Sequence, residues 1–101
     1  MRVMVFFDLP VLTAKNRRDY THFRKYLLKN GFMMEQESVY SKLVPNSTAA
    51  DSVIENVRKN RTEDGVIEIL KVTEKQYNSI QYITGERNNS VLDTDERIVF
   101  L

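Results

Sequence analysis

Several residue types are missing or scarce in this chain of 101 residues, and each absence removes a class of chemistry. There is no Cys, which excludes a disulfide scaffold, a Cys-ligated zinc site and a catalytic thiol. The one His, His22, excludes a multi-His metal site within a single chain. With only three Gly, the chain has no Gly-rich loop of the kind that cradles nucleotide phosphates.

The length and the hydrophobic content of the chain indicate one small globular domain. Hydrophobic residues make up 42% of the chain and aromatic residues 10%, too much for a disordered protein. A domain of this size buries only ~65% of its unfolded surface, so association with a second copy would stabilise it. We interpret the opening run, MRVMVFFDLPVL, as a buried strand rather than a signal peptide or membrane span. The sequence therefore predicts a cytoplasmic protein that makes no membrane contact.

The net charge of +1 conceals two opposed regions. Residues 1–61 hold 11 basic and 6 acidic side chains, a balance of +5, whereas residues 62–101 hold 4 and 8, a balance of −4. The first region suits a polyanionic partner and the second a different surface, although a solvated exterior with no partner is the alternative.

Hydrophobic periodicity predicts alternating strands and helices. The main elements are a strand at 3–7, a helix at 13–30, strands at 32–37 and 39–44, a helix at 48–60 and a strand at 66–72. A helical turn at 73–78, a short strand at 80–84, a polar loop at 85–95 and an apolar run at 97–101 follow. This order predicts an α+β protein with the ferredoxin-like βαββαβ fold, as a single domain with a core at about 1–84 and a C-terminal extension at 85–101.

Caps and turns support these boundaries. Thr13 is suited to cap the first helix and Gly31 to end it. Thr48 and Asp51 resemble a capping box for the second helix. Asp64 and Gly65 form a turn signal before the strand at 66–72.

The first helix divides into a core face and a basic face. At about 100° per residue, Tyr20, Phe23 and Leu27 share one side. The basic residues of the other side are Arg18, His22, Lys25 and Lys29. Cations at a helix start, here Lys15 and Arg17, oppose the helix dipole, so they indicate an electronegative partner, with a solvated face as the alternative.

Asp8 follows the first strand, at a point where a rigid strand aims a carboxylate. Mg²⁺ often takes only one or two protein carboxylates, and a two-fold dimer would bring two copies of Asp8 together. The alternative is that Asp8 caps the turn by accepting hydrogen bonds from nearby backbone N–H groups.

The chain ends on an apolar run that needs a partner strand or surface. Its residues are Ile98, Val99, Phe100 and Leu101. This run could be covered in three ways: by pairing with its own sheet, with the sheet of a second subunit, or with another protein by strand addition.

Taken in order, these segments resemble the CRISPR-associated protein two family, the small dimeric subunits of the spacer-acquisition machinery, and especially its type II members. The segments that carry the resemblance are 3–10, 15–27, 31–32, 36–40 and 68–76. The resemblance implies a ferredoxin-like homodimer with extra C-terminal strands that cross to the partner subunit or meet an integrase subunit.

The resemblance also implies two activities. One is a dimeric scaffold that binds the backbone of duplex DNA and, with the integrase subunit, captures and integrates new spacer DNA. The other is a metal-dependent endonuclease with Asp8 as catalytic residue and ligand for Mg²⁺ or Mn²⁺, acting on single-stranded RNA or on DNA. Phe7 stands where many members have Tyr, which removes a hydroxyl from that site. The DNA-binding residues implied by position are Lys15, Arg17, Arg18, Arg24, Lys25 and Arg87.

Three functions therefore remain open from sequence. The scaffold comes first, a phosphodiesterase acting on its own is the alternative, and a small-molecule sensor is a third. The third would need an apolar pocket, and nothing in the sequence indicates one.

Overall fold

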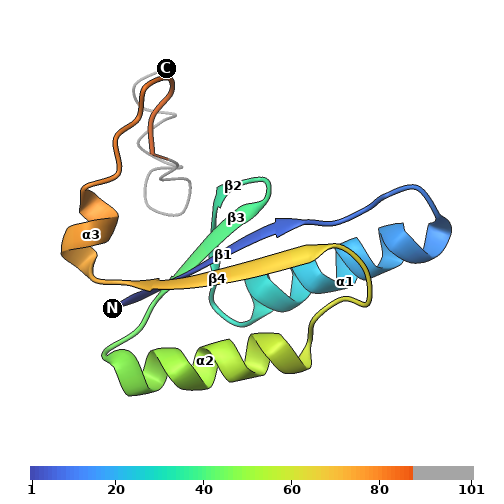
Figure 1. The fold of residues 1–101 in the computed structure, drawn as a ribbon, viewed down its shortest axis with the longest axis horizontal. Helices are drawn as coiled ribbons and strands as arrows, with labels where there is room; N and C mark the ends of the chain where they lie inside the picture. Colours follow the sequence, from blue (N-terminus) through green and yellow to red (C-terminus); the bar gives the residue numbers. More distant parts are fainter. Residues whose placement is uncertain (88–101) are drawn as a thin grey trace, which may run out of the picture.

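The computed structural model describes residues 1–87. Its elements are β1 (Arg2–Asp8), α1 (Ala14–Lys29), β2 (Met33–Gln36), β3 (Val39–Leu43), α2 (Ser47–Lys59), β4 (Val66–Val72) and α3 (Glu74–Asn78). The four strands form one sheet in the order β2-β3-β1-β4, with every neighbouring pair antiparallel. The helices α1 and α2 lie on the same side of it (Figure 1). This is the predicted ferredoxin-like arrangement. The predicted C-terminal strands, and the run from Ile98 to Leu101, lie outside the described residues.

The core fills the space between the sheet and the two long helices. β1 lies between β3 and β4 and presents Val3, Val5 and Phe7 to this core, all buried. Phe23 and Leu27 of α1 are buried against them, which confirms the predicted core face of the helix. The Phe7 ring packs edge-on against Phe23 at 5.3 Å.

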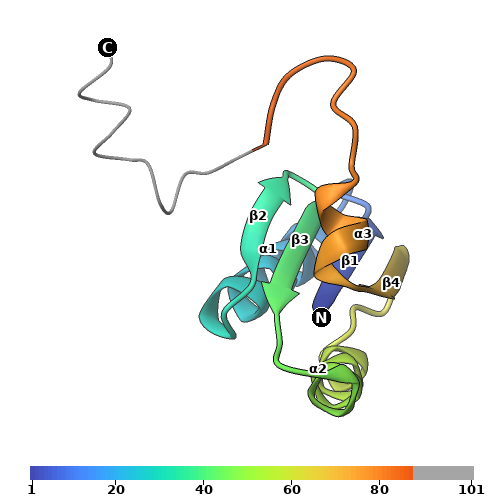
Figure 2. The ribbon, with the colours of Figure 1, turned by 90° about the vertical axis from the view of Figure 1, so that its left-hand side faces the viewer.

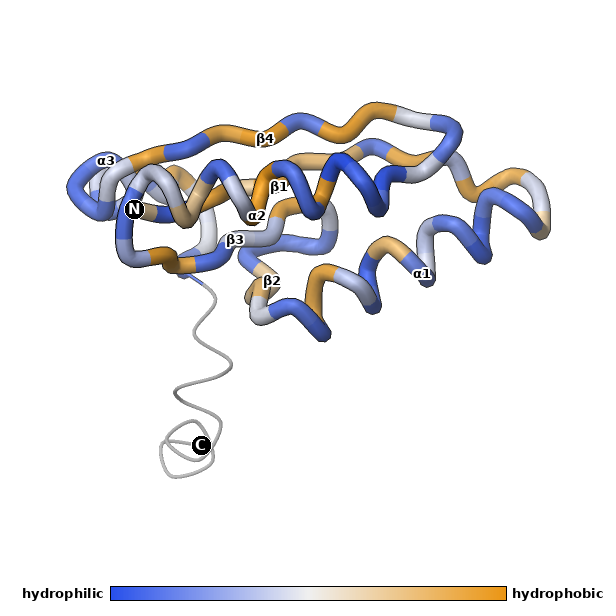
Figure 3. The backbone as a smooth tube through the Cα atoms, turned by 90° about the horizontal axis from the view of Figure 1, so that it is seen from below, coloured by the Kyte–Doolittle hydropathy of each residue, from blue (hydrophilic) through white to orange (hydrophobic). Residues whose placement is uncertain are grey.

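The other face of the sheet is covered only in part. Met4 lies opposite Leu70 and Asp8 opposite Val66 in the β1–β4 register, so these side chains point away from α1 and α2. Leu70 remains half exposed, and two polar residues, Glu68 and Lys71, interrupt the otherwise apolar sequence of β4 (Figure 3). We call this surface the open face. α3 lies at its end, away from the β1–α1 loop (Figures 1 and 2).

Two predicted helix boundaries are confirmed. The Thr13 hydroxyl accepts a hydrogen bond from the Asn16 N–H at 3.0 Å, and Asn16 completes a capping box. At the other end of α1, Gly31 has a φ of 86°, in the left-handed region that favours Gly. The predicted helical turn is α3, which Thr73 caps. Among residues 1–87, no helix has both the length and the apolar character needed to cross a membrane.

The predicted cap of the second helix is wrong. α2 begins one residue earlier, and Asn46 is its N-cap, because the side-chain oxygen of Asn46 accepts from the Ala49 N–H at 2.8 Å. Asp51 instead pairs with Lys71 of β4 at 2.7 Å. Asn ranks among the strongest N-cap residues, so it takes the place that we had given to Thr48.

The predicted strand at 80–84 is also wrong. Ser79 and Ile80 donate their N–H groups to carbonyls of α3, so the chain is still completing the helix end there. Ile83 is 90% exposed, and no residue from 80 to 84 belongs to a strand.

Gly65 explains why the turn before β4 sits close to the end of β1. Its φ is 92°, and a Cβ at this position would lie 2.7 Å from the carbonyl oxygen of Asp8 and 2.8 Å from the Leu9 side chain. Only Gly allows this approach. The turn therefore helps to fix the backbone from which the Asp8 side chain projects.

Candidate nucleic-acid interface and carboxylate site

The outer face of α1 carries a row of exposed, unpaired basic side chains, which we call the basic stripe. Its members are Arg18, His22, Lys25 and Lys29. None of them makes a hydrogen bond or ion pair with any of residues 1–87. With a rise of 1.5 Å per residue, the stripe spans about 16 Å of helix. α1 is largely hydrophilic along its length (Figure 3).

Lys15, predicted to contact nucleic acid, is already engaged by acidic residues of the protein. Its Nζ lies 2.9 Å from Asp19 and 2.8 Å from Glu63. Hydrogen bonds to these carboxylates, to Glu63 first, raise the pKa of Lys15 well above its usual value. A phosphate would have to compete with both carboxylates for this ammonium group.

Arg17 and Arg24, also predicted to contact nucleic acid, have structural partners too. Arg17 donates to the backbone oxygens of Val11 and Leu12, each at 3.2 Å, and so holds the loop before α1. Arg24 donates its Nε–H to the hydroxyl of buried Tyr40 at 2.9 Å. Each of these side chains is therefore partly committed to the fold.

Arg87, the last predicted nucleic-acid contact, does not join the basic stripe. It donates to the side-chain oxygen of Asn78 at 3.2 Å, and its guanidinium lies 4.4 Å from the centre of the Tyr77 ring. A hydrogen bond with Tyr82 is the main cause that raises its pKa above the ordinary value. The structure thus places Arg87 beside α3, over the open face, whereas α1 lies on the opposite side of the sheet.

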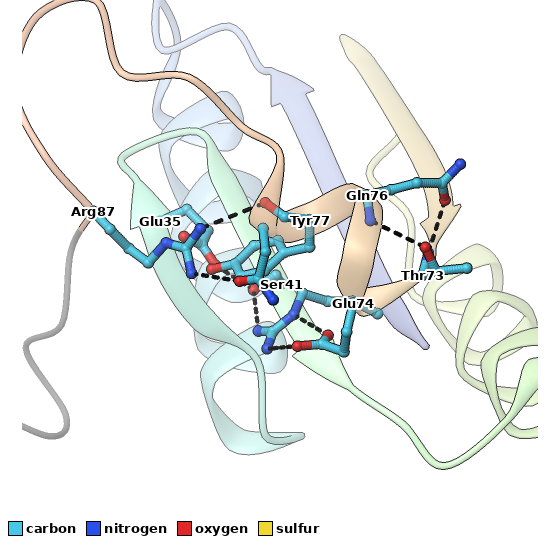
Figure 4. Close-up of polar contacts among 9 residues, drawn as sticks. Glu35, Ser41, Thr73, Glu74, Gln76, Tyr77 and Arg87 are labelled. Atoms are coloured by element: carbon cyan, nitrogen blue, oxygen red, sulfur yellow. Dashed lines mark hydrogen bonds and ion pairs between the residues drawn. The ribbon is translucent and has the colours of Figure 1, made fainter.

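Beneath α3 lies a polar network that sequence reasoning missed, which we call the α3 cluster. Its members are Arg2, Glu35, Ser41, Glu74 and Tyr77. Arg2 donates to both carboxylate oxygens of Glu74, at 2.8 and 3.0 Å, and to the Ser41 hydroxyl at 3.3 Å. Glu35 accepts from the hydroxyls of Ser41 and Tyr77, which converge on it between the sheet and α3 (Figure 4).

The α3 cluster shifts the pKa values of Glu74 and Tyr77. The hydrogen bond from Arg2 lowers the pKa of Glu74. Burial, followed by the hydrogen bond to Glu35, raises the pKa of Tyr77 to about 12. The only signal in the sequence was a charged residue next to an apolar run, as at Arg2, and that pattern does not reveal which residue pairs with it.

Asp8 ends β1 on the open face, with its side chain exposed. Its carboxylate accepts no hydrogen bond within residues 1–87, so the alternative that it caps the turn has no support there. Residues 1–87 also contain no group of three or more His, Cys, Asp or Glu placed to hold a metal ion. At Asp8, one copy of the chain therefore offers a divalent cation fewer than three such ligands, and water, phosphate or a second copy would have to complete the coordination.

Comparisons with known proteins identify the family of the chain. A family model described as CRISPR associated protein Cas2 matches residues 1–80. A CRISPR-associated endoribonuclease Cas2 of Treponema denticola is 55% identical over 101 residues, the full length of both chains. Its namesake in Streptococcus mutans UA159 is 46% identical over all of this chain and 93% of the relative.

A solved structure supports the fold independently. The crystal structure of Streptococcus pyogenes Cas2 at pH 6.5 matches with a TM-score of 0.62, covering 83% of this chain and all of that chain at 18% sequence identity. The protein has the ferredoxin-like fold, and its curated relatives carry the name of a CRISPR-associated nuclease. The chain belongs to the Cas2 family of CRISPR-associated proteins.

Proposed function

We propose that this Cas2-family protein acts in spacer acquisition, as a dimer that holds duplex DNA by its phosphate backbone alongside an integrase subunit. The basic stripe carries this proposal, because its side chains are exposed, aligned along one helix and without partners in residues 1–87. Phosphate contacts position a duplex without reading its sequence. Such indifference suits a protein that must accept DNA of any origin.

The proposed dimer uses the open face. That face exposes Val66 and Leu70, and a small domain gains stability when a second copy covers such a surface. Asp8 lies on the same face, so this mode of association would bring two of its carboxylates toward one another. For the run from Ile98 to Leu101 we propose pairing with the partner subunit or the integrase, on the evidence of its sequence alone.

The test of the scaffold is duplex binding by a variant without the stripe's permanent charges. Fluorescence anisotropy with a labelled duplex of mixed sequence should show that Arg18→Ala, Lys25→Ala and Lys29→Ala together weaken binding by about tenfold or more. Because each lost phosphate contact reduces the salt slope by about 0.9, the variant should also become less sensitive to salt.

The matched control removes the same three charges from another surface. Arg58, Lys59 and Arg61 form a basic patch at the end of α2, and Arg58 and Arg61 already have contacts within the fold. Their combined replacement by Ala should leave most of the affinity intact. An equal loss in both variants would mean that net charge, and not the basic stripe, governs binding.

A second function is favoured by the free carboxylate of Asp8 and by the endoribonuclease name of the relatives. A divalent cation of the Mg²⁺ or Mn²⁺ type would polarise a phosphoryl oxygen and lower the pKa of an attacking water. The role of Asp8 would be to hold that cation, with the two copies in a dimer contributing one carboxylate each. The described part of the chain has no evident general base beside Asp8 to accept a proton from that water.

Replacing Asp8 by Asn separates the two functions. Because the side chain is exposed and unpartnered, the variant should fold normally and bind duplex DNA as the unaltered protein does. Cleavage of single-stranded RNA and of DNA, assayed with Mg²⁺ and with Mn²⁺, should be lost. Cleavage that persists unchanged would remove Asp8 from the mechanism, while the scaffold proposal would stand.

A further inference from the structure

We propose that His22 is a proton-linked phosphate contact, so that the protein binds duplex DNA more tightly as the pH falls through the range in which His titrates. This inference rests on the proposed binding of nucleic acid by the basic stripe. It adds a regulator of that surface, since His is the side chain whose charge ordinarily changes between about pH 5 and 8.

The position of His22 in the stripe supports this role. It lies four residues after Arg18 and three before Lys25, so the three side chains neighbour one another on one helix face. With Ala14, Arg17 and Thr21 they line a shallow hollow that is built from α1 alone. A phosphate that contacts Arg18 and Lys25 would therefore lie within reach of the imidazole.

His22 has no structural task that would compete with such a contact. Its side chain is exposed and has no hydrogen bond or ion pair within residues 1–87. A neutral imidazole offers one N–H donor and no charge, whereas an imidazolium offers two donors and a positive charge. Protonation thus converts the middle of the stripe from a weak phosphate contact into a strong one.

The charged groups around His22 leave it free to respond to a ligand. Arg18, Lys25 and Lys29 are permanent cations on its own face, and Tyr26 flanks it. Asp19 lies three residues before it on α1, and Lys15 holds that carboxylate. No carboxylate in residues 1–87 pairs with the imidazole, so an incoming phosphate would be its first anionic partner. Because binding and protonation are linked reciprocally, each must favour the other.

The experiment measures duplex affinity against pH at constant ionic strength, by anisotropy, for the full chain and two variants. Between about pH 8 and pH 5.5, the unaltered protein should gain roughly threefold to tenfold in affinity, and its salt slope should steepen by about 0.9 for each His contact. His22→Gln should bind with the weaker affinity and the shallower slope at every pH. His22→Lys should bind tightly and without pH dependence.

Each outcome separates this inference from the function on which it rests. A pH dependence that survives in His22→Gln would overturn the role of His22. If the unaltered protein binds equally at all pH values while loss of Arg18, Lys25 and Lys29 abolishes binding, the scaffold stands and the His22 inference fails. If that triple variant binds normally, the scaffold itself fails.

Discussion

The basic side chains of the α3 cluster and of the basic stripe lie in opposite environments. In the α3 cluster, Arg2 is buried and bonded to Glu74 and Ser41. In the basic stripe, Arg18 and Lys25 are exposed and have no partner in residues 1–87. A cation with a fixed partner contributes to the stability of the fold, whereas a cation without one is available to a ligand. The comparison teaches that the number of positive charges in a sequence is a poor guide to binding until their partners are known.

The largest effect should come from breaking the α3 cluster at Arg2. Arg2→Met removes the charge but keeps a long side chain, and leaves Glu74 and the Ser41 hydroxyl without their donor. We expect the free energy of unfolding to fall by about 2 kcal/mol, measured by urea denaturation. Arg18→Met is the matched control and should change it by less than about 0.5 kcal/mol. Equal losses in the two variants would contradict the distinction between the two regions.

A smaller effect is expected at Tyr77, where Tyr77→Phe removes only the hydroxyl that donates to Glu35. The unfolding free energy should fall by about 1 kcal/mol near neutral pH. The pKa of Tyr77 is raised to about 12 in the folded protein, so the unfolded chain loses this proton first. The stability that depends on the protonated hydroxyl is therefore complete below about pH 10 and is lost as the pH rises toward 12.

The measurement for Tyr77 is a set of urea unfolding curves at increasing alkaline pH. The unaltered protein should lose stability more steeply than Tyr77→Phe between about pH 10 and 12, since the variant lacks the titrating group. Parallel curves for the two proteins would show that the Tyr77 hydroxyl is not part of the network. Comparison with the variant removes the contribution of the other Tyr and Lys residues.

The smallest effect should appear at Glu63. Its partner Lys15 shares a property with each region: it is exposed, like Arg18, and paired, like Arg2. Lys15 is exposed but paired with Glu63 and Asp19, so Glu63→Gln should partly release it for phosphate. Duplex affinity should rise by about twofold and the urea midpoint should stay unchanged, because exposed ion pairs contribute little to stability. Lys15→Ala combined with Glu63→Gln is the control and should cancel the gain. A fall in affinity for Glu63→Gln alone would show that the ion pair positions Lys15 for binding.

Sequence reasoning was reliable where a local pattern determines the structure. The period of the apolar residues defined α1 and its buried face at Phe23 and Leu27, and Thr13 and Gly31 marked its ends. The strand at β4 and the position of Asp8 at the end of β1 were also predicted from neighbouring residues. Each of these features depends on residues close together in the chain.

Features that depend on distant residues were not predictable in this way. Arg2 and Glu74 are separated by 72 positions, and no spacing rule joins them. Lys15 counted as a free cation because Glu63 belongs to a turn far along the chain. The apolar pattern at 80–84 predicted a strand, but it does not encode whether a sheet edge lies within reach, and α3 carries the chain away from β4.

The bond between Arg2 and Glu74 also bears on how the protein is made. β1 is synthesised before the other described elements, yet it is an inner strand and needs both β3 and β4 as neighbours. Arg2, the first residue of β1, is then hydrogen-bonded to Glu74 at the start of the last described helix. The nascent chain cannot close until nearly the whole domain has been synthesised, and until then the apolar strand stays unpaired.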